Sequence, residues 1–164
     1  MSAGKKTNKN TFIILGIAVI LAIGAFIFKG GSNENKEAVA AGADLVIPKA
    51  EITETVKFYP YKVGKTSMEV LAVKASDGTI RTALNTCQVC NGSPKAYYEQ
   101  EGNVVVCQNC GNRFKMDMIE QQRGGCNPIP ISKENKTEDS VNITISKELL
   151  AEAEPLFKTW KSNK

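Results

Sequence analysis

The sequence contains no histidine, and this absence removes several kinds of chemistry from consideration. An imidazole cannot serve as general acid or base, and no metal site can mix histidine with cysteine. The chain also lacks a glycine-rich phosphate loop and a Ser/His/Asp set. Any chemistry must therefore come from the remaining side chains, of which cysteine is the most informative.

Acidic residues are also missing from one region, the first 33 residues. Lys5, Lys6 and Lys9 stand there before an uncharged apolar run at residues 12–28. As a helix this run would be about 25 Å long, at the short end of what crosses a bilayer. Because lysines favour the cytoplasmic side, the sequence predicts a single-pass protein of the cell membrane. Its tail at 1–11 would be cytoplasmic, its transmembrane anchor would be 12–28, and the rest of the chain would be extracytoplasmic.

A cleaved signal peptide is the alternative for this N-terminal region. Its small-x-small site would be Ala38-Val39-Ala40, which lies ten residues beyond the apolar run, and this distance favours a retained anchor. Residues 29–49 are mostly small and polar, so we expect a linker there and a folded domain at 50–164.

Nothing in the charge distribution favours a nucleic-acid partner. Apart from the three N-terminal lysines, 18 basic and 17 acidic side chains remain, which is close to neutral. Without a basic stripe to neutralise phosphates, we expect no nucleic-acid binding.

The folded part alternates apolar and polar residues with the period of two typical of β-strands. Strands are expected at residues 52–58, ended by Pro60, and at 68–73, 80–84, 104–106 and 141–145, with tight turns at 76–79 and 102–103. Ser146 is expected to cap a C-terminal helix that runs toward Trp160 and is weakened by Pro155. The sequence therefore predicts a mostly β fold, a small antiparallel domain with one C-terminal helix.

Four cysteines have the spacing of a metal site. Cys87-x-x-Cys90 is followed after sixteen residues by Cys107-x-x-Cys110, and each pair comes after a predicted strand. Two tight turns brought together by a hairpin would place four sulfurs around one centre. These four residues are the candidate metal ligands, and they suit zinc and an iron–sulfur cluster equally well.

Two disulfides, or redox-active dithiols, are the alternatives to metal binding. A redox dithiol normally needs one pair at the start of a helix, whereas Cys110 is followed by Gly111-Asn112, a turn. Five cysteines in total also argue against a purely disulfide framework.

The fifth cysteine, Cys126, lies in a stiff segment, Gly124-Gly125-Cys126-Asn127-Pro128-Ile129-Pro130. Glycines allow a close approach of the backbone, and prolines restrict the exit. Cys126 is expected near the site, as a ligand for a second metal, an alternative ligand or a packed thiol.

These segments together resemble the FtrD-like membrane iron–sulfur domain family. The resemblance is carried by residues 81–90 (RTALNTCQVC), 97–98 (YY), 106–114 (VCQNCGNRF) and 124–130 (GGCNPIP), and it covers roughly residues 50–150. It implies a membrane-associated, redox-active metal protein that accompanies bacterial ferrous-iron import. It also implies a cofactor, with [2Fe–2S] first and zinc as the alternative, at Cys87, Cys90, Cys107, Cys110 and Cys126.

The layout is more distantly similar to a Rieske domain, in which two strand-borne loops hold a cluster, and its hairpin loops are also like those of zinc ribbons. Three functions are therefore carried forward. The first is electron transfer or metal handling for a bacterial metal-uptake system. In this role the protein would be an accessory protein rather than a stand-alone enzyme, and its partner would be a membrane permease or a redox protein of that system. The second is a structural zinc-ribbon interaction module at the membrane, and the third is an extracytoplasmic thiol–disulfide oxidoreductase.

Overall fold

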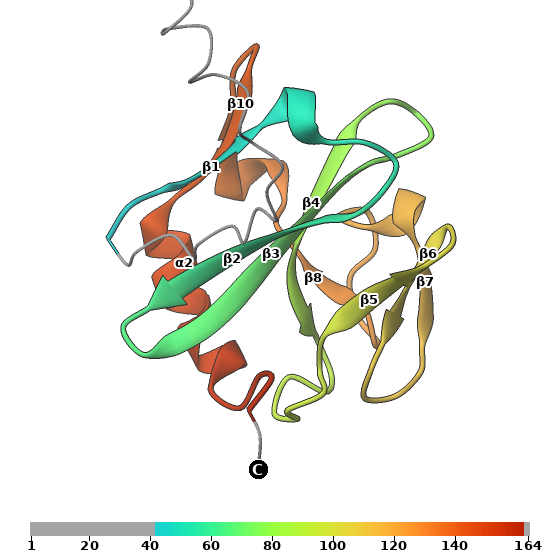
Figure 1. The fold of residues 1–164 in the computed structure, drawn as a ribbon, viewed down its shortest axis with the longest axis vertical. Coiled ribbons are helices and arrows are strands. Elements are labelled where there is room, and N and C mark those ends of the chain that lie inside the picture. The colour runs from blue at the N-terminus through green and yellow to red at the C-terminus, as the bar shows by residue number, and fades with distance from the viewer. Residues whose placement is uncertain (1–41, 163–164) are drawn as a thin grey trace, which may run out of the picture. The chain divides into compact units, whose positions relative to one another are not determined.

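Ten short strands and one short α-helix form residues 42–162, the part of the chain that the computed structural model describes (Figure 1). The mostly antiparallel β fold with a short C-terminal helix is confirmed. The predicted tail and anchor at 1–28 lie outside the described residues. Within residues 42–162, no helix is both long and apolar enough to cross a bilayer.

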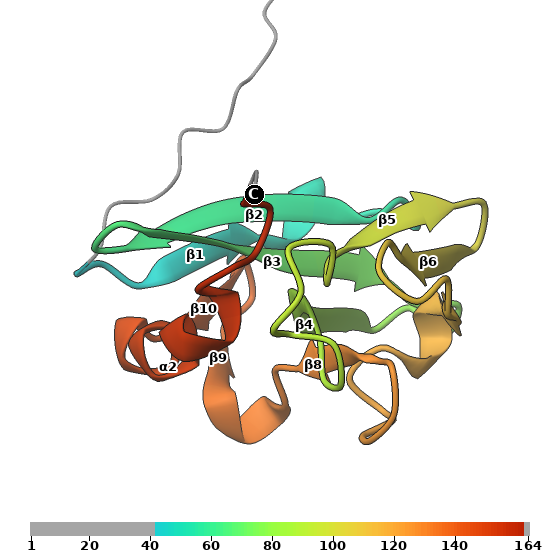
Figure 2. The same cartoon turned by 90° about the horizontal axis from the view of Figure 1, so that it is seen from below.

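The strands form three antiparallel sheets. The central sheet has the order β2-β3-β4-β8, and the two smaller sheets have the orders β1-β10-β9 and β5-β6-β7. The strands are β1 (Leu45–Pro48), β2 (Lys57–Val63), β3 (Thr66–Lys74), β4 (Ile80–Cys87), β5 (Tyr98–Glu101), β6 (Val104–Cys107), β7 (Arg113–Lys115), β8 (Pro128–Pro130), β9 (Lys136–Glu138) and β10 (Asn142–Ile145). The helix, α2 (Lys147–Ala153), and the β1-β10-β9 sheet lie on one side, and β5 and β6 lie on the other (Figure 2).

The folded part begins earlier than residue 50. Strand β1 falls inside the segment expected to be a linker, and it pairs with β10 from Leu45 opposite Ile145 to Pro48 opposite Asn142. Leu45 and Ile47 are buried in the core. Four residues with alternating burial therefore extend the domain toward the N-terminus.

The strand predicted at 52–58 lies further along the chain, because β2 starts at Lys57 and continues through Pro60 to Val63. Proline removes a ladder hydrogen bond, so it is tolerated on an edge strand. Among residues 42–162, β2 pairs with β3 alone. Pro60 lies opposite Glu69 without ending the strand. The expectation that Pro60 ends this run is therefore wrong.

The predicted helix cap at Ser146 is confirmed. The Ser146 side chain accepts a hydrogen bond from the backbone N–H of Leu149, at 3.2 Å, and α2 starts at the next residue, Lys147. The α-helix is short, because Pro155 lies in the 3-10 turn Glu154–Phe157 that follows it. The face of this segment that packs against the core carries three buried residues, Leu150, Ala153 and Phe157.

Two apolar clusters make up the core. The first joins the β1-β10-β9 sheet, the helix and one face of the central sheet. The second packs the other face of the central sheet against the small β5-β6-β7 sheet and contains two of the cysteines. Its buried members are Val56, Leu71, Val73, Ala83, Cys87, Ala96, Tyr98, Val105, Cys107, Phe114, Met116 and Ile119.

Strand β4 is the central element because it pairs with both β3 and β8 and ends at Cys87. Its pairing with β8 shifts register between Leu84 and Cys87. Such an irregularity frees backbone groups for other partners. The Asn85 carbonyl accepts a hydrogen bond from the Trp160 indole, at 2.8 Å, so the bulge is fixed by the C-terminal segment.

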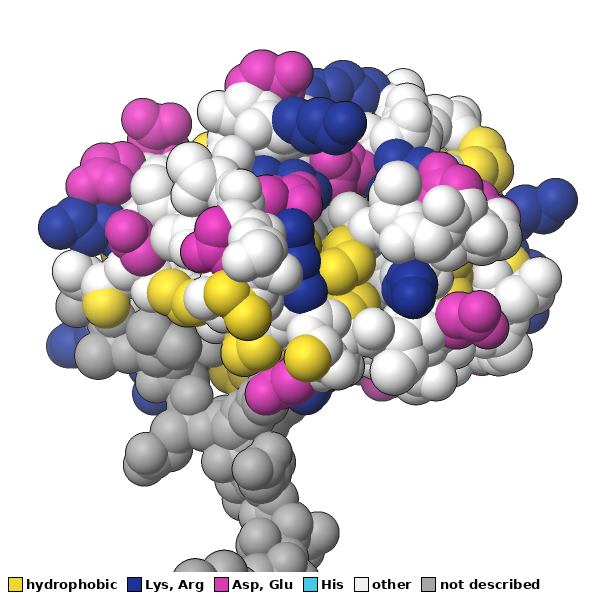
Figure 3. All heavy atoms as spheres, turned by 90° about the horizontal axis from the view of Figure 1, so that it is seen from above, with side chains coloured by type: hydrophobic (Ala, Val, Ile, Leu, Met, Phe, Trp, Pro, Cys, Tyr) yellow, Lys and Arg dark blue, Asp and Glu magenta, His cyan; other side chains and the backbone are white. Residues whose placement is uncertain are grey.

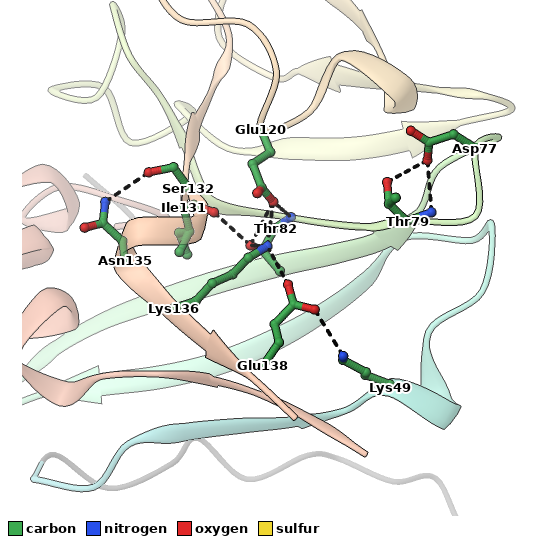
Figure 4. Close-up of polar contacts among 10 residues, drawn as sticks. All are labelled: Lys49, Asp77, Thr79, Thr82, Glu120, Ile131, Ser132, Asn135, Lys136 and Glu138. Atoms are coloured by element: carbon green, nitrogen blue, oxygen red, sulfur yellow. Dashed lines mark hydrogen bonds and ion pairs between the residues drawn. The ribbon is translucent and has the colours of Figure 1, made fainter. Parts of the chain in front are cut away.

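One ion pair is buried beside Thr82, near the start of β4. Lys136 lies 2.7 Å from Glu120, and their side chains are 1% and 5% exposed. Thr82 contacts both, because its backbone N–H donates to Glu120 and its hydroxyl accepts from Lys136 (Figure 4). Lys136 also lies 3.5 Å from Glu138, which in turn lies 3.1 Å from Lys49 nearer the surface. Elsewhere on the surface seen from above, basic and acidic side chains are interspersed (Figure 3).

Candidate metal centre

Two strands deliver the two cysteine pairs, as the sequence predicts. Cys87 is the last residue of β4 and Cys107 the last residue of β6. In the first loop the Cys90 backbone N–H donates to the Cys87 sulfur at 3.4 Å, and the two Sγ atoms are 3.2 Å apart. In the second loop the Gly111 N–H donates to the Cys107 carbonyl at 2.8 Å. Gly111 has φ +73°, which closes the turn in a conformation that favours glycine.

The two loops are joined by hydrogen bonds around their bases. Cys87 N–H donates to the Ala96 carbonyl at 3.1 Å, and Gln108 N–H donates to the Tyr97 carbonyl at 2.8 Å. At the tips, Ser93 donates its hydroxyl to Asn109 at 2.6 Å. These hydrogen bonds hold the loops side by side.

A third segment, residues 124–128, closes the site. Gly124 and Gly125 both have positive φ, +86° and +78°, so this sharp path needs glycine at both positions. Gly124 N–H donates to the Gln88 side chain at 2.9 Å, and Gln88 N–H donates to the Asn127 carbonyl at 3.0 Å. The segment then enters β8, which pairs with β4.

The second loop also holds this third segment. The Asn112 side chain donates to the Cys126 carbonyl at 2.8 Å, and the Tyr98 hydroxyl donates to the same oxygen at 2.9 Å. Cys126 is thus fixed beside both cysteine pairs.

The five sulfurs form two overlapping groups, which we call the inner and outer triads. The inner triad is Cys87, Cys90 and Cys107, and the outer triad is Cys90, Cys110 and Cys126. Within each triad all Sγ atoms lie within 4.8 Å of one another. Cys87 and Cys107 are buried, whereas Cys110 is exposed and the other two are partly exposed. Cys90 belongs to both groups and lies between them.

This grouping differs from a single four-cysteine tetrahedron. Among the described residues no set of four cysteines has all its Sγ atoms within 4.8 Å of one another. The structure brings together all five candidate cysteines, but it places Cys110 with Cys126 and Cys90 rather than with both buried sulfurs.

A comparison with protein families decides what kind of chain this is. Residues 51–157 match the family described as membrane iron–sulfur containing protein, FtrD-like. The chain belongs to the FtrD-like family. No curated protein and no solved structure matches it. The match supports a membrane protein with an iron-related role, and the clustered thiols of this FtrD-like chain fit metal binding.

The pKa values of the five thiols are shifted in different directions. Burial raises the pKa of the Cys90 and Cys107 thiols to about 12, and a hydrogen bond with Cys110 raises the pKa of Cys126 to about 11. Burial also acts to raise the pKa of Cys87, but hydrogen bonds from Tyr98 and Cys90 outweigh it and leave that pKa below its ordinary value.

Cys110 follows the same pattern in the outer triad. Burial acts to raise its pKa, whereas hydrogen bonds from the Asn112 backbone and the Cys107 thiol lower it overall. Each triad of the FtrD-like site therefore contains one cysteine whose pKa is lowered. Metal ligation requires thiolates, so it releases protons from the others.

Several residues that shape this site were not expected from the sequence. Gln88 and Asn112 lie inside or beside the two cysteine loops and bind the Gly124–Cys126 segment through their amides. Asn85 holds Tyr98 on the opposite hairpin. Polar residues next to cysteines are a weak signal, because the same residues occur in ordinary turns.

Proposed function

We propose that four of the five clustered cysteines of this FtrD-like protein hold a binuclear iron–sulfur cluster, with the fifth as an alternative ligand. The protein would work at the outer face of the cell membrane in electron transfer or metal handling for an iron or other metal uptake system. Cys87 and Cys107 are the inner ligands in this proposal. Cys90 and Cys110 supply the outer ones, and Cys126 is the alternative outer ligand.

The split of the sulfurs into two triads is the observation that carries the proposal. Zinc–sulfur bonds are about 2.3 Å long, so two sulfurs on one ion can be no more than about 4.6 Å apart. The four cysteines of the two pairs do not all fall within 4.8 Å of one another. A cluster with two metal ions fits this longer arrangement, because its ligands attach at two centres.

The donor set suits the cluster. All five donors are thiols, and with no histidine in the chain the ligands are the soft sulfurs that iron–sulfur clusters use. A bound cluster supplies one-electron chemistry, while the chain supplies its surroundings. The buried Cys87 and Cys107 shield the inner side from water, and the exposed Cys110 marks the side on which an electron-transfer partner approaches.

Contacts other than the thiols join the three cysteine segments, which supports a resident cofactor. Backbone and amide hydrogen bonds hold these segments together. A thiol–disulfide oxidoreductase would need just one accessible pair, whereas here both first cysteines, Cys87 and Cys107, are buried.

The test is to produce residues 30–164 under anaerobic conditions and to measure iron, acid-labile sulfide, zinc and the visible spectrum. Iron with sulfide and a charge-transfer band would support the proposal. Stoichiometric zinc without colour would contradict it in favour of a zinc-ribbon interaction module. A metal-free protein with two disulfides would favour the oxidoreductase.

A further inference from the structure

The loops that carry the cysteines form one continuous face of the domain. We call it the cysteine face and define it as residues 88–95, 108–115 and 121–125. Strands β4 and β6 lead into it at the same end of the domain (Figure 1). The Ser93 hydroxyl joins the first range to Asn109 in the second, at 2.6 Å. The Gly124 N–H joins the third range to Gln88 in the first, at 2.9 Å, so loops far apart in sequence present a single surface.

The cysteine face carries basic side chains and no acidic ones. Its four cations are all exposed, and they are Lys95, Arg113, Lys115 and Arg123. No residue of the three ranges is Asp or Glu, although the whole chain has 17 acidic residues beside 21 basic ones. The excess of positive charge is therefore a local property of this face.

Most of these cations are not neutralised by a neighbour. Arg113 lies 2.7 Å from Glu101 of the adjoining strand β5, so its charge is offset. Within residues 42–162, Lys95, Lys115 and Arg123 form no ion pair. An oxidised binuclear cluster with four thiolates carries a net charge of about −2, which these three exposed cations exceed. A molecule that approaches the face thus meets positive charge.

One apolar side chain stands out on the same face. Val89 is 66% exposed and lies in the first cysteine loop, next to Cys90. The Cys90 sulfur lies within 4.8 Å of that of the exposed Cys110. Protein interfaces combine an apolar centre with a polar rim, and Val89 with its surrounding cations has this arrangement on a small scale.

We propose that the cysteine face docks an electron-transfer protein whose own surface is acidic around its redox centre. The inference rests on the proposed iron–sulfur function and names the chemistry of its partner. Opposite charges guide the encounter, and Val89 makes an apolar contact beside the sulfurs. One electron then passes from the reduced cluster to the oxidised centre of the partner, and no covalent bond forms or breaks.

The probe for this experiment is cytochrome c in two forms. Native cytochrome c is basic, whereas succinylation of its lysines makes the surface acidic and keeps the haem. The full iron-loaded chain is reduced with dithionite, freed of the excess and mixed with each ferric form in a stopped-flow instrument. The haem absorbance then reports the one-electron transfer. At low ionic strength the succinylated form is expected to react on the order of tenfold faster, and salt should remove the difference.

Charge reversal on the cysteine face is the second measurement. The double variant Lys95→Glu, Arg123→Glu should slow the reaction of succinylated cytochrome c and accelerate that of the native form, with iron and sulfide content unchanged. The matched control is Lys62→Glu, Lys65→Glu, because both lysines are exposed at the β2–β3 turn and the net charge changes equally. Val89→Ser should slow both forms even at high salt, since salt does not screen an apolar contact.

Equal rates for the two cytochromes, a faster reaction of the native form, or a double variant that behaves like its control would overturn the docking proposal. Protection of Lys95 from acetylation in phosphatidylglycerol vesicles, without protection in phosphatidylcholine vesicles, would place this face on an anionic membrane and overturn it as well. A chain without iron and sulfide, or an iron-loaded chain that reduces neither cytochrome, would instead overturn the proposed function itself.

Discussion

At the scale of single residues, the cysteines differ in what they are expected to contribute. Cys107 is one of the two buried sulfurs, and the proposed cluster uses both as its inner ligands. Cys126 is one of three sulfurs in the outer triad, of which the proposed cluster uses two. This difference leads to a direct comparison.

Cys107→Ser is expected to abolish binding of metal, and Cys126→Ser to retain at least the first metal ion. The measurement is iron and zinc per chain in purified protein, with Val89→Ser as control, because Val89 is exposed in the first loop and offers no ligand. Equal loss of metal in Cys107→Ser and Cys126→Ser would show that Cys126 is an obligatory ligand.

The buried ion pair between Lys136 and Glu120 leads to a second prediction at this scale. Lys136→Met leaves the Glu120 carboxylate buried without its cation, which typically costs about 3–5 kcal/mol of the free energy of unfolding. Adding Glu120→Gln should recover part of that loss, because it removes the unpaired charge. Urea denaturation followed by circular dichroism measures both, with the exposed Lys158→Met as control.

No loss of stability in Lys136→Met would show that the folded protein does not depend on this ion pair. The same variant also bears on the cysteine site, because Glu120 lies in the segment that leads to Cys126. Glu120 has a positive φ of +68°, and the ion pair anchors the start of that segment to β4 and β9.

At the scale of elements, the C-terminal segment supports the first cysteine loop. Thr159 donates its hydroxyl to the Gly92 carbonyl at 2.8 Å, and Lys161 N–H donates to the Pro94 carbonyl at 2.8 Å. The Lys161 ammonium lies 4.5 Å from the Trp160 ring centroid and 4.8 Å from that of Tyr97. All of these contacts come from residues beyond the end of the family match at residue 157.

Ending the chain after Phe157 is therefore expected to loosen the first cysteine loop. Backbone amides of residues 88–97 should exchange faster with deuterium, and metal should be released faster to a chelator. A chain that ends after Ser162 is the control, because it retains all of the contacts described. Unchanged exchange at 88–97 in the shorter chain would show that this loop is held by the β4–β8 region alone.

Sequence patterns predicted the local elements of this fold well and the pairing between distant ones poorly. The turns at 76–79 and 102–103 and the helix cap at Ser146 follow from near neighbours in the chain, and all occur. Strands β1 and β8 are short and contain proline, and they form because β10 and β4 offer partners far away in sequence. No local pattern indicates such pairing.

The same distinction applies to the site. Spacing identified the two cysteine pairs and the Gly-Gly-Cys segment, and the structure brings all five sulfurs together. The division into inner and outer triads depends on how far the 124–128 segment reaches across both loops, through Gln88 and Asn112. That distance is a property of packing, so spacing alone could not provide it.

At the scale of the whole molecule, we predict that an anchor at 12–28 would hold the domain outside the cytoplasm. The full chain should then remain with the membrane after a carbonate wash, and residues 42–162 alone should not. An epitope tag at the C-terminus should be cleaved by protease added to intact spheroplasts, and a tag at the N-terminus should be protected. A mature chain that starts after Ala40 would contradict retention of the anchor.

The meeting of three separate segments at one sulfur cluster also has a consequence for the folding equilibrium. A cofactor bound there cross-links residues 87, 107 and 126, and so closes long loops that the unfolded chain would otherwise explore. Because the three segments are already paired in the described structure, little of the binding free energy is spent on ordering them. Occupancy should therefore appear as an upward shift of the melting temperature that grows with the supply of cofactor.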